Sequence, residues 1–396
     1  MQMTTLTPDT LPQLQAILAE TGIDGWLLFD FQRCNPIALG ILGLRGMLTR
    51  RHLAYVPRTG VPVAITPMIE PAPWSAWPTA WGRIRYTTRG ELTAAVATLV
   101  GGQRIAMEYS PEGAVPYLDR VPSGAVEMAR AAGATVVSSS DLVTRFHAVW
   151  NAAQLAGHRQ AAEVIAHLAR SAFTWVSSER AAGRPVSEHG IQAWIIERIA
   201  AAGLEYDYPP IVAAGAHTAD VHYEPSAQRP RVVEPGDVLL IDLWARYPDG
   251  VYADQTWMGS IGEPTDRMRT IWAAVRDSRD AAIAFLEARV EGGVIVRGGE
   301  AHDVARAVLV ERGVGQWAIG RTGHSIDTRN LHGAGPNIDN TETAETRVLI
   351  AGLGFSIEPG LYIDGEFGMR SEVNASIGDR ELIITPREYQ HELIVV

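Results

Sequence analysis

One segment, residues 237–259, constrains the fold more than any other because it places acidic residues inside otherwise apolar strands. It reads DVLLIDLWARYPDGVYADQTWMG. Its Pro-Asp-Gly sequence at 248–250 is typical of a turn, and the flanking runs have strand character. The segment therefore predicts a hairpin of two strands, and folding it brings the carboxylates of Asp242 and Asp254 near each other.

Two carboxylates that face each other in an apolar sheet cost several kcal/mol in desolvation and repulsion unless a proton or a cation compensates. Glu358 in GFSIEPG and Glu372 in GMRSEVN also lie in mostly apolar, strand-like sequence, and His324 in GRTGHSID lies in a Gly-rich loop. Such a set suits Mn²⁺, Co²⁺, Fe²⁺ or Zn²⁺. Spacing alone does not select these five among 45 acidic residues and 11 histidines, so ordinary surface acids remain the alternative interpretation here.

The chain of 396 residues exceeds what one hydrophobic core usually supports. We expect a domain boundary near residue 150. Before it, a small α/β domain is predicted from a helix near 8–22, strands at 25–31, 51–57, 61–67 and 104–109, and an irregular surface segment near 69–84. After it, we expect helices at about 151–183, 187–202, 265–290 and 299–312 among strand-like segments, with Ser187 and Thr265 as N-caps of the second and third helices. Together these elements favour an α+β domain.

Composition narrows the class of protein. Hydrophobic residues are 46% and charged residues 20% of the chain, as in ordinary globular proteins. A net charge of −11 argues against a general affinity for nucleic acid or an anionic membrane. The start of the chain lacks the pattern of a secretory signal. A single cysteine, Cys34, predicts a reducing compartment, so the predicted location is the cytoplasm. Its thiol is expected to be buried or partly buried and to have no role.

Four motifs occur in a fixed order, namely IDLWARYPDGVYADQTW, TGHSID, SIEPGLYI and GMRSE. Together they resemble the ligand signature of the M24 metallopeptidases, the family of Xaa-Pro aminopeptidase, prolidase and methionine aminopeptidase. The resemblance covers most of residues 151–396, and residues 1–150 resemble the creatinase-type domain that precedes it. It implies an α+β fold, with a pita-bread catalytic domain over 151–396 after the smaller α/β domain over 1–150.

The resemblance also implies roles for individual residues. Two divalent metal ions, Mn²⁺ foremost, would be held by five ligands: Asp242, Asp254, His324, Glu358 and Glu372. A hydroxide between the metals would attack an Xaa-Pro bond, with Glu358 as general base. His222 in VHYEP and His332 in LHGAG match the family histidines that contact substrate. Thr256 and Arg370 match residues beside the cluster, and Arg370 would also bind substrate.

Two residues near the ligands depart from the family pattern. Trp244 stands where the family has glycine, two residues after Asp242 and on the same strand face. It would line the substrate pocket and make it narrower, although core packing alone is an equal alternative. Asn374 replaces an acidic residue that often follows the last ligand, which removes a charge next to the metal ligands.

Three further residues have alternative interpretations. The loop from His324 to His332 is one residue longer than usual, so His332 could instead be a loop histidine that caps backbone groups. Arg33 is a candidate for a substrate-carboxylate contact across a homodimer, or a solvated surface residue. His217 is expected to be a polar loop residue.

Three classes of function follow. The first is a metal-dependent Xaa-Pro dipeptidase or aminopeptidase acting on small peptides. The second keeps the fold but acts as a hydrolase or lyase on a small non-peptide metabolite, as creatinase-type enzymes do. The third is a non-catalytic pita-bread binding protein. All five ligands are present, which favours a metal enzyme over the third class.

Overall fold

The computed structural model describes residues 5–396 and divides into two compact units, with the division between residues 149 and 150. Residues 1–4 of the predicted first domain lie outside the described residues. Among residues 5–396, we find no helix with both the length and the apolar character that crossing a membrane requires.

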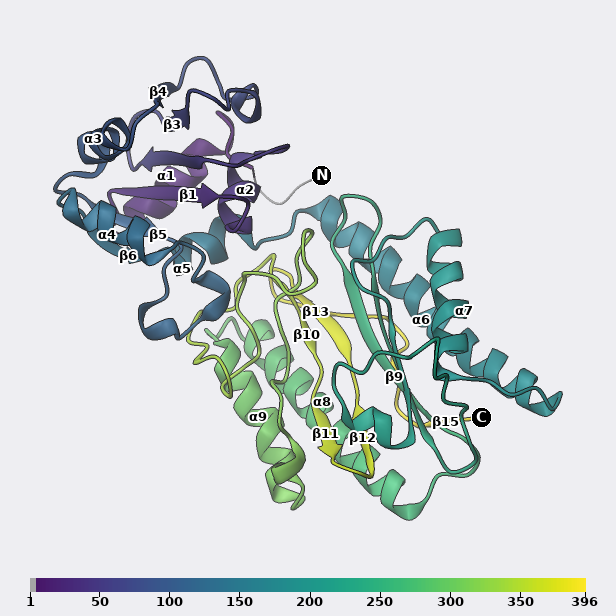
Figure 1. Ribbon diagram of the computed structural model, residues 1–396. Helices are drawn as coiled ribbons and strands as arrows, with labels where there is room; N and C mark the ends of the chain where they lie inside the picture. The colour runs from purple at the N-terminus through teal and green to yellow at the C-terminus, as the bar shows by residue number, and fades with distance from the viewer. Residues whose placement is uncertain (1–4) are drawn as a thin grey trace. The chain divides into compact units, whose positions relative to one another are not determined.

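The N-terminal unit is built on a six-stranded mixed sheet with the order β4-β3-β2-β1-β5-β6 (Figure 1). Its strands are β1 (Gly25–Phe31), β2 (Arg51–Pro57), β3 (Val63–Pro67), β4 (Gly82–Tyr86), β5 (Arg104–Met107) and β6 (Thr135–Ser138). Its helices are α1 (Leu11–Glu20), α2 (Pro36–Leu42), α3 (Arg89–Val100), α4 (Ser123–Ala131) and the short α5 (Ser140–Leu142). The strands predicted at 25–31 and 51–57 are confirmed at both ends.

The segment near 69–84 is irregular and largely at the surface, as predicted, except that two of its tryptophans, Trp74 and Trp81, are buried. Trp74 is buried, and its indole N–H donates to His52 Nδ1 at 2.8 Å. Trp77 packs edge to face against both Trp74 and Trp81, with ring centroids 5.2 and 4.8 Å apart. Trp77, which is partly exposed, therefore helps to cover the buried Trp74 and Trp81, and the segment ends in β4. The prediction that Cys34 is buried or partly buried is wrong, because the thiol lies on an exposed turn after β1.

The C-terminal unit places strands between two pairs of helices, α6 with α7 and α8 with α9 (Figure 1). The helices are α6 (Ala152–Ala181), α7 (Glu188–Ala201), α8 (Asp266–Glu291) and α9 (Gly298–Glu311). The strands form three sheets, β15-β9-β8-β7, β10-β13-β14 and β11-β12. Their bounds are β7 (Ile211–Ala214), β8 (Val238–Ala245), β9 (Ala253–Ser260), β10 (Gly354–Ile357), β11 (Gly360–Ile363), β12 (Phe367–Arg370), β13 (Val373–Ile377), β14 (Leu382–Thr385) and β15 (Ile394–Val395).

Local sequence signals explain where these helices begin. The side chain of Asn151 caps α6 by accepting from the Gln154 amide, and the Ser187 side chain caps α7. Thr265 caps α8, as predicted. The apolar faces of α6 and α7 pack on β8 and β9, whose residues are all buried. This packing holds the β8–β9 hairpin rigidly in the core.

Candidate active site

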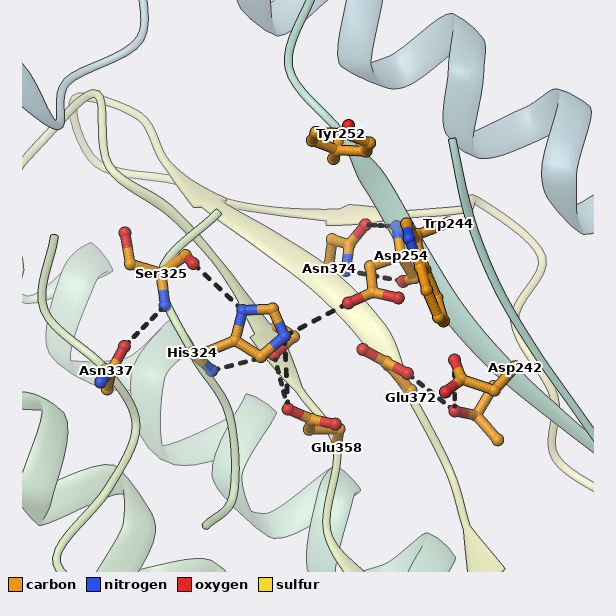
Figure 2. Close-up of polar contacts among 12 residues, drawn as sticks. Asp242, Trp244, Tyr252, Asp254, His324, Ser325, Asn337, Glu358, Glu372 and Asn374 are labelled. Carbon is orange, nitrogen blue, oxygen red and sulfur yellow. Dashed lines mark hydrogen bonds and ion pairs between the residues drawn. The ribbon is translucent and has the colours of Figure 1, made fainter. Parts of the chain in front are cut away.

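The predicted hairpin is confirmed, and it places four functional side chains on one face. Strands β8 and β9 pair antiparallel, with Asp242 opposite Thr256 and Trp244 opposite Asp254. Directly opposed residues share a face, as do residues two apart along one strand. Figure 2 shows the two carboxylates and the indole on the same side of the hairpin.

The other ligand candidates come from segments distant in sequence. Glu358 directly follows β10, and Glu372 lies between β12 and β13. His324 Nε2 lies 3.2 Å from Asp254 Oδ2 and 3.5 Å from Glu358 Oε1. Asp254, His324 and Glu372 each offer a ligand atom, and these atoms all lie within 4.8 Å of one another. The structure therefore brings the predicted ligands together in one cluster, as Figure 2 shows.

The His324 imidazole is oriented for metal binding. Its Nδ1 lies 3.0 Å from the Ser325 carbonyl oxygen, which can only accept, so Nδ1 carries the proton and Nε2 presents its lone pair to the carboxylates. The Ser356 hydroxyl accepts from the His324 amide at 2.9 Å and donates to Glu358 Oε1 at 3.2 Å. Burial lowers the pKa of His324 to about 4, so the ring stays neutral near pH 7.

Thr256 and Arg370 connect the carboxylates, as the resemblance implies for residues beside the cluster. Arg370 Nε donates to Thr256 Oγ1 at 2.7 Å, and this hydroxyl donates to Glu372 Oε2 at 2.7 Å. Arg370 also forms a buried ion pair with Asp242. The guanidinium is only 5% exposed, so its contacts hold metal ligands in place, whereas its predicted contact with substrate stays a prediction.

The buried carboxylates of the cluster would be stabilised in their charged forms by added positive charge. Burial, together with the neighbouring carboxylates, raises the pKa of Asp242 and of Asp254 to about 7. The same causes raise the pKa of Glu372 well above its usual value. Although burial alone would raise it, the neighbouring His324 imidazole and the Arg370 guanidinium hold the pKa of Glu358 below its usual value.

One buried oxygen supports the same conclusion. Among the side chains that the structure describes, Glu372 Oε1 is buried without a hydrogen-bond partner. Buried carboxylate oxygens are costly unless they are paired or coordinate a metal. Carboxylate oxygens beside one neutral imidazole are the donors that Mn²⁺ and similar cations accept. The residues therefore fit a divalent metal site.

Asn374 and Trp244, which depart from the family pattern, have different contacts. Asn374 Oδ1 accepts from the Asp254 amide at 2.9 Å, and its Nδ2 donates to the Asp254 carbonyl at 2.7 Å. Asn374 thus holds the backbone of a ligand. The Trp244 indole is 8% exposed, and its N–H donates to Asp207 Oδ1 at 2.8 Å. Asp207 comes from the loop before β7, so two elements fix the ring beside Asp254.

The predicted substrate histidines lie in two loops. The His332 ring packs edge to face on His324, with centroids 4.2 Å apart. His222 is exposed. His332 is exposed as well, and the protein atoms around its ring, followed by the charges of His324 and Arg321, lower its pKa. The contacts of both histidines with substrate stay predictions.

Arg33 belongs to the N-terminal unit. It is exposed, its φ is +64°, and its Nη1 donates to the Gly46 carbonyl at 2.9 Å. Its proposed role across a homodimer stays a prediction.

Sequence reasoning missed several residues of the site. Arg321 lies close enough for its charge to lower the pKa of Asp254, His324 and Glu358. Ser356 could have been found, because it lies two residues before Glu358 in the same strand-like motif. Nothing in the local sequence pointed to Asp207, because it meets Trp244 only in the folded chain.

The fold and this cluster define a class, a metal-dependent hydrolase with a pita-bread catalytic domain. Residues 156–378 match Metallopeptidase family M24. This match spans more than half of the chain and includes all five ligand candidates. The chain therefore belongs to metallopeptidase family M24, and the family and α+β fold predicted from the ordered motifs are confirmed.

Relatives extend the likeness over both units. The chain is 28% identical over 360 residues to "Probable dipeptidase PepE" of Mycobacterium bovis, covering 90% of this chain and 88% of that protein. It is 35% identical over 169 residues to "Xaa-Pro dipeptidase" of Lactobacillus delbrueckii subsp. lactis, covering 43% of this chain and 42% of the other. The crystal structure of dipeptidase PepE from Mycobacterium ulcerans superposes with a TM-score of 0.78 at 24% identity, over 98% of this chain and 97% of that one.

Proposed function

We propose that this metallopeptidase hydrolyses Xaa-Pro bonds in dipeptides or short peptides, using two divalent metal ions. The observation that carries the proposal is the buried cluster of four carboxylates and one neutral imidazole, with the unpartnered Glu372 Oε1. Asp242, Asp254, His324, Glu358 and Glu372 would hold the ions. The relatives named as dipeptidase and Xaa-Pro dipeptidase support a peptide substrate.

The residues then have separate tasks. Two divalent ions, when bound, lower the pKa of water so that hydroxide is available near neutral pH. The Glu358 carboxylate accepts the proton of the attacking water and passes it to the departing amine. His222 and His332 donate hydrogen bonds to the charge that develops on the scissile carbonyl oxygen. A prolyl nitrogen has no N–H to offer, and none of these contacts requires one.

Trp244 gives the pocket its proposed selectivity. Because Asp207 and the β8 backbone both hold the indole next to Asp254, the ring reduces the space beside the metal ligands. We propose that small residues are preferred there. Mn²⁺ is the proposed metal, the proposed assembly is a homodimer that works in the cytoplasm, and Arg33 is the proposed contact to a substrate carboxylate from the partner subunit.

A peptide panel tests the proposal. The purified chain, loaded with Mn²⁺, is incubated with Gly-Pro, Ala-Pro, Ala-Ala and a longer Xaa-Pro-Xaa peptide, and free amines are quantified. We expect hydrolysis of the prolyl substrates with kcat/KM at least about 10⁴ M⁻¹ s⁻¹ for the best of them. Cleavage of Ala-Ala alone would refute the preference for Xaa-Pro bonds. Tight binding of two metal ions without cleavage of any peptide in the panel would refute the proposed peptide substrate and favour a non-peptide one.

The role of Glu358 has its own test. Glu358→Gln keeps the size of the side chain and removes the proton acceptor, so we expect kcat to fall by at least about 100-fold. Glu366→Gln is the matched control, because Glu366 is an exposed carboxylate paired with Arg267. Metal content is measured for both variants. A Glu358→Gln enzyme with full metal content and full activity would refute the general-base role.

A further inference from the structure

A second buried carboxylate lies outside the ligand cluster and organises the loop of a substrate histidine. Glu188 is the first residue of α7 and is 1% exposed. Its carboxylate accepts hydrogen bonds from the Ala214 amide at 2.7 Å, from His217 Nδ1 at 3.0 Å and from the Tyr223 hydroxyl at 2.7 Å. Such charge-assisted hydrogen bonds are roughly twice as strong as neutral ones.

All three donors belong to one continuous segment, residues 214–223. It starts at the end of β7 and runs through the 3₁₀ helix η5 (Gly215–Ala219). The rings of His217 and Tyr223 stack, with centroids 4.3 Å apart and planes 28° apart. The carboxylate and this ring stack therefore hold the segment at both ends, immediately beside His222.

The same segment is fastened to the strands that carry the site. The Gly368 amide of β12 donates to Thr218 Oγ1 at 2.8 Å. A Cβ at Gly368 would lie 2.2 Å from the Thr218 carbonyl oxygen, so only glycine permits this approach. Upstream, β7 pairs with β8, with Ile211 opposite Asp242. The position of the segment is thereby tied to Asp242 and, through β12, to Arg370.

His222 itself is exposed. Loops that carry functional side chains need a rigid support, because a displacement of about 1 Å can cost a hundredfold in rate. We propose that Glu188, acting through His217 and Tyr223, is a positioning residue that holds His222 in its catalytic place. This proposal rests on the proposed function, in which His222 donates to the developing charge on the substrate.

His217 thereby differs from the polar loop residue expected from the sequence. Its Nδ1 faces Glu188 in the interior, while its side chain is 40% exposed. Burial, followed by the hydrogen bond to Glu188, raises the pKa of Tyr223, so the phenol remains a donor throughout the neutral range. The hydrogen bond from Tyr223 to Glu188 is therefore present throughout that range.

The first test removes one hydrogen bond and keeps the ring stack. Tyr223→Phe deletes the hydroxyl that donates to Glu188. Tyr86→Phe is the matched control, because it deletes a tyrosine hydroxyl that donates to the Arg51 carbonyl at 2.8 Å in the N-terminal unit. In the Mn²⁺-loaded enzyme with an Xaa-Pro dipeptide, we expect Tyr223→Phe to lower kcat about tenfold with KM changed less than about twofold. Tyr86→Phe should leave both unchanged.

The second test is a double-mutant cycle, which separates positioning of His222 from a general loss of stability. We expect Glu188→Gln to lower kcat about 30-fold in the wild-type background and less than about twofold in the His222→Ala background. Equal effects in both backgrounds would overturn the proposal. If Glu188→Gln fails to fold, Tyr223→Phe replaces it in the cycle.

A third readout needs no substrate. The ring carbon and proton resonances of His222, assigned by their loss in His222→Ala, report the order of this side chain. We expect them to broaden or move toward the values of free histidine in Tyr223→Phe and in Glu188→Gln, but not in Tyr86→Phe. Unchanged His222 resonances in both loop variants would overturn the positioning role. Absence of prolyl peptidase activity in the wild-type enzyme would instead count against the proposed function alone.

Discussion

Metal binding by this chain should release protons, because the ligand cluster holds protons when no cation balances its charge. Asp242 and Asp254 have pKa values raised to about 7, and the pKa of Glu372 is raised well above its usual value. Metal ligands must be deprotonated. At pH 7, each aspartic acid is therefore about half protonated, so binding displaces about one proton from this pair, and the raised pKa of Glu372 adds to the release.

The dependence on pH follows with a definite sign. A raised pKa means that the metal-free site binds protons below about pH 7, so metal affinity rises with pH. With one to two protons displaced from the two aspartic acids, affinity should increase about 10-fold to 100-fold between pH 6 and pH 7, and Glu372 makes the increase steeper. His324, with its pKa lowered to about 4, is already neutral in this range and contributes none.

Calorimetry measures this release directly. The chelator-treated protein is titrated with Mn²⁺ at pH 7 in buffers of different ionisation enthalpy, and the dependence of the observed heat on the buffer gives the number of protons. Glu372→Gln should release fewer protons than the wild type and bind the metal more weakly. Release of less than about half a proton at pH 7, with affinity independent of pH, would refute the electrostatic reasoning.

Three further outcomes follow from the structure. Asn374→Ala removes both hydrogen bonds to the Asp254 backbone, so we expect metal affinity to fall about tenfold, measured by competition with a chelating dye. Trp244→Gly should raise kcat/KM for Xaa-Pro dipeptides with a bulky Xaa by about tenfold relative to Gly-Pro. Asp207→Asn keeps an acceptor for the indole and should leave this ratio unchanged. Parallel changes in kcat/KM for all dipeptides would contradict the role of Trp244 in selectivity. Burial raises the pKa of Glu108 in the N-terminal unit to about 7. The stability that this residue contributes below its unfolded pKa is therefore lost as pH rises toward 7. Urea denaturation at pH 5 and pH 8 should show that the free energy of unfolding of the wild type falls by about 3 kcal/mol more than that of Glu108→Gln.

Much of the fold was predictable, because its elements are encoded by short stretches of sequence. The alternation of strand residues and the turn at 248–250 predicted the β8–β9 hairpin, and the caps at Ser187 and Thr265 predicted where α7 and α8 begin. Periodicity and capping depend on residues a few positions apart. The burial of Trp74 and Trp81 within the surface segment near 69–84 was not predictable in this way, since it depends on ring contacts with Trp77 and His52 that only the fold creates.

The candidate site was likewise predictable in part from the sequence and in part only from the fold. The sequence by itself determined which side chains could be ligands and, through the order of four motifs, the family. Only the tertiary structure decided what each ligand touches, because the partners lie far apart along the chain: Arg370 meets Asp242 and Asp207 meets Trp244. Burial arises only in the folded chain. It raises the pKa of the carboxylates, so their charged forms are stable only when a cation is bound beside them.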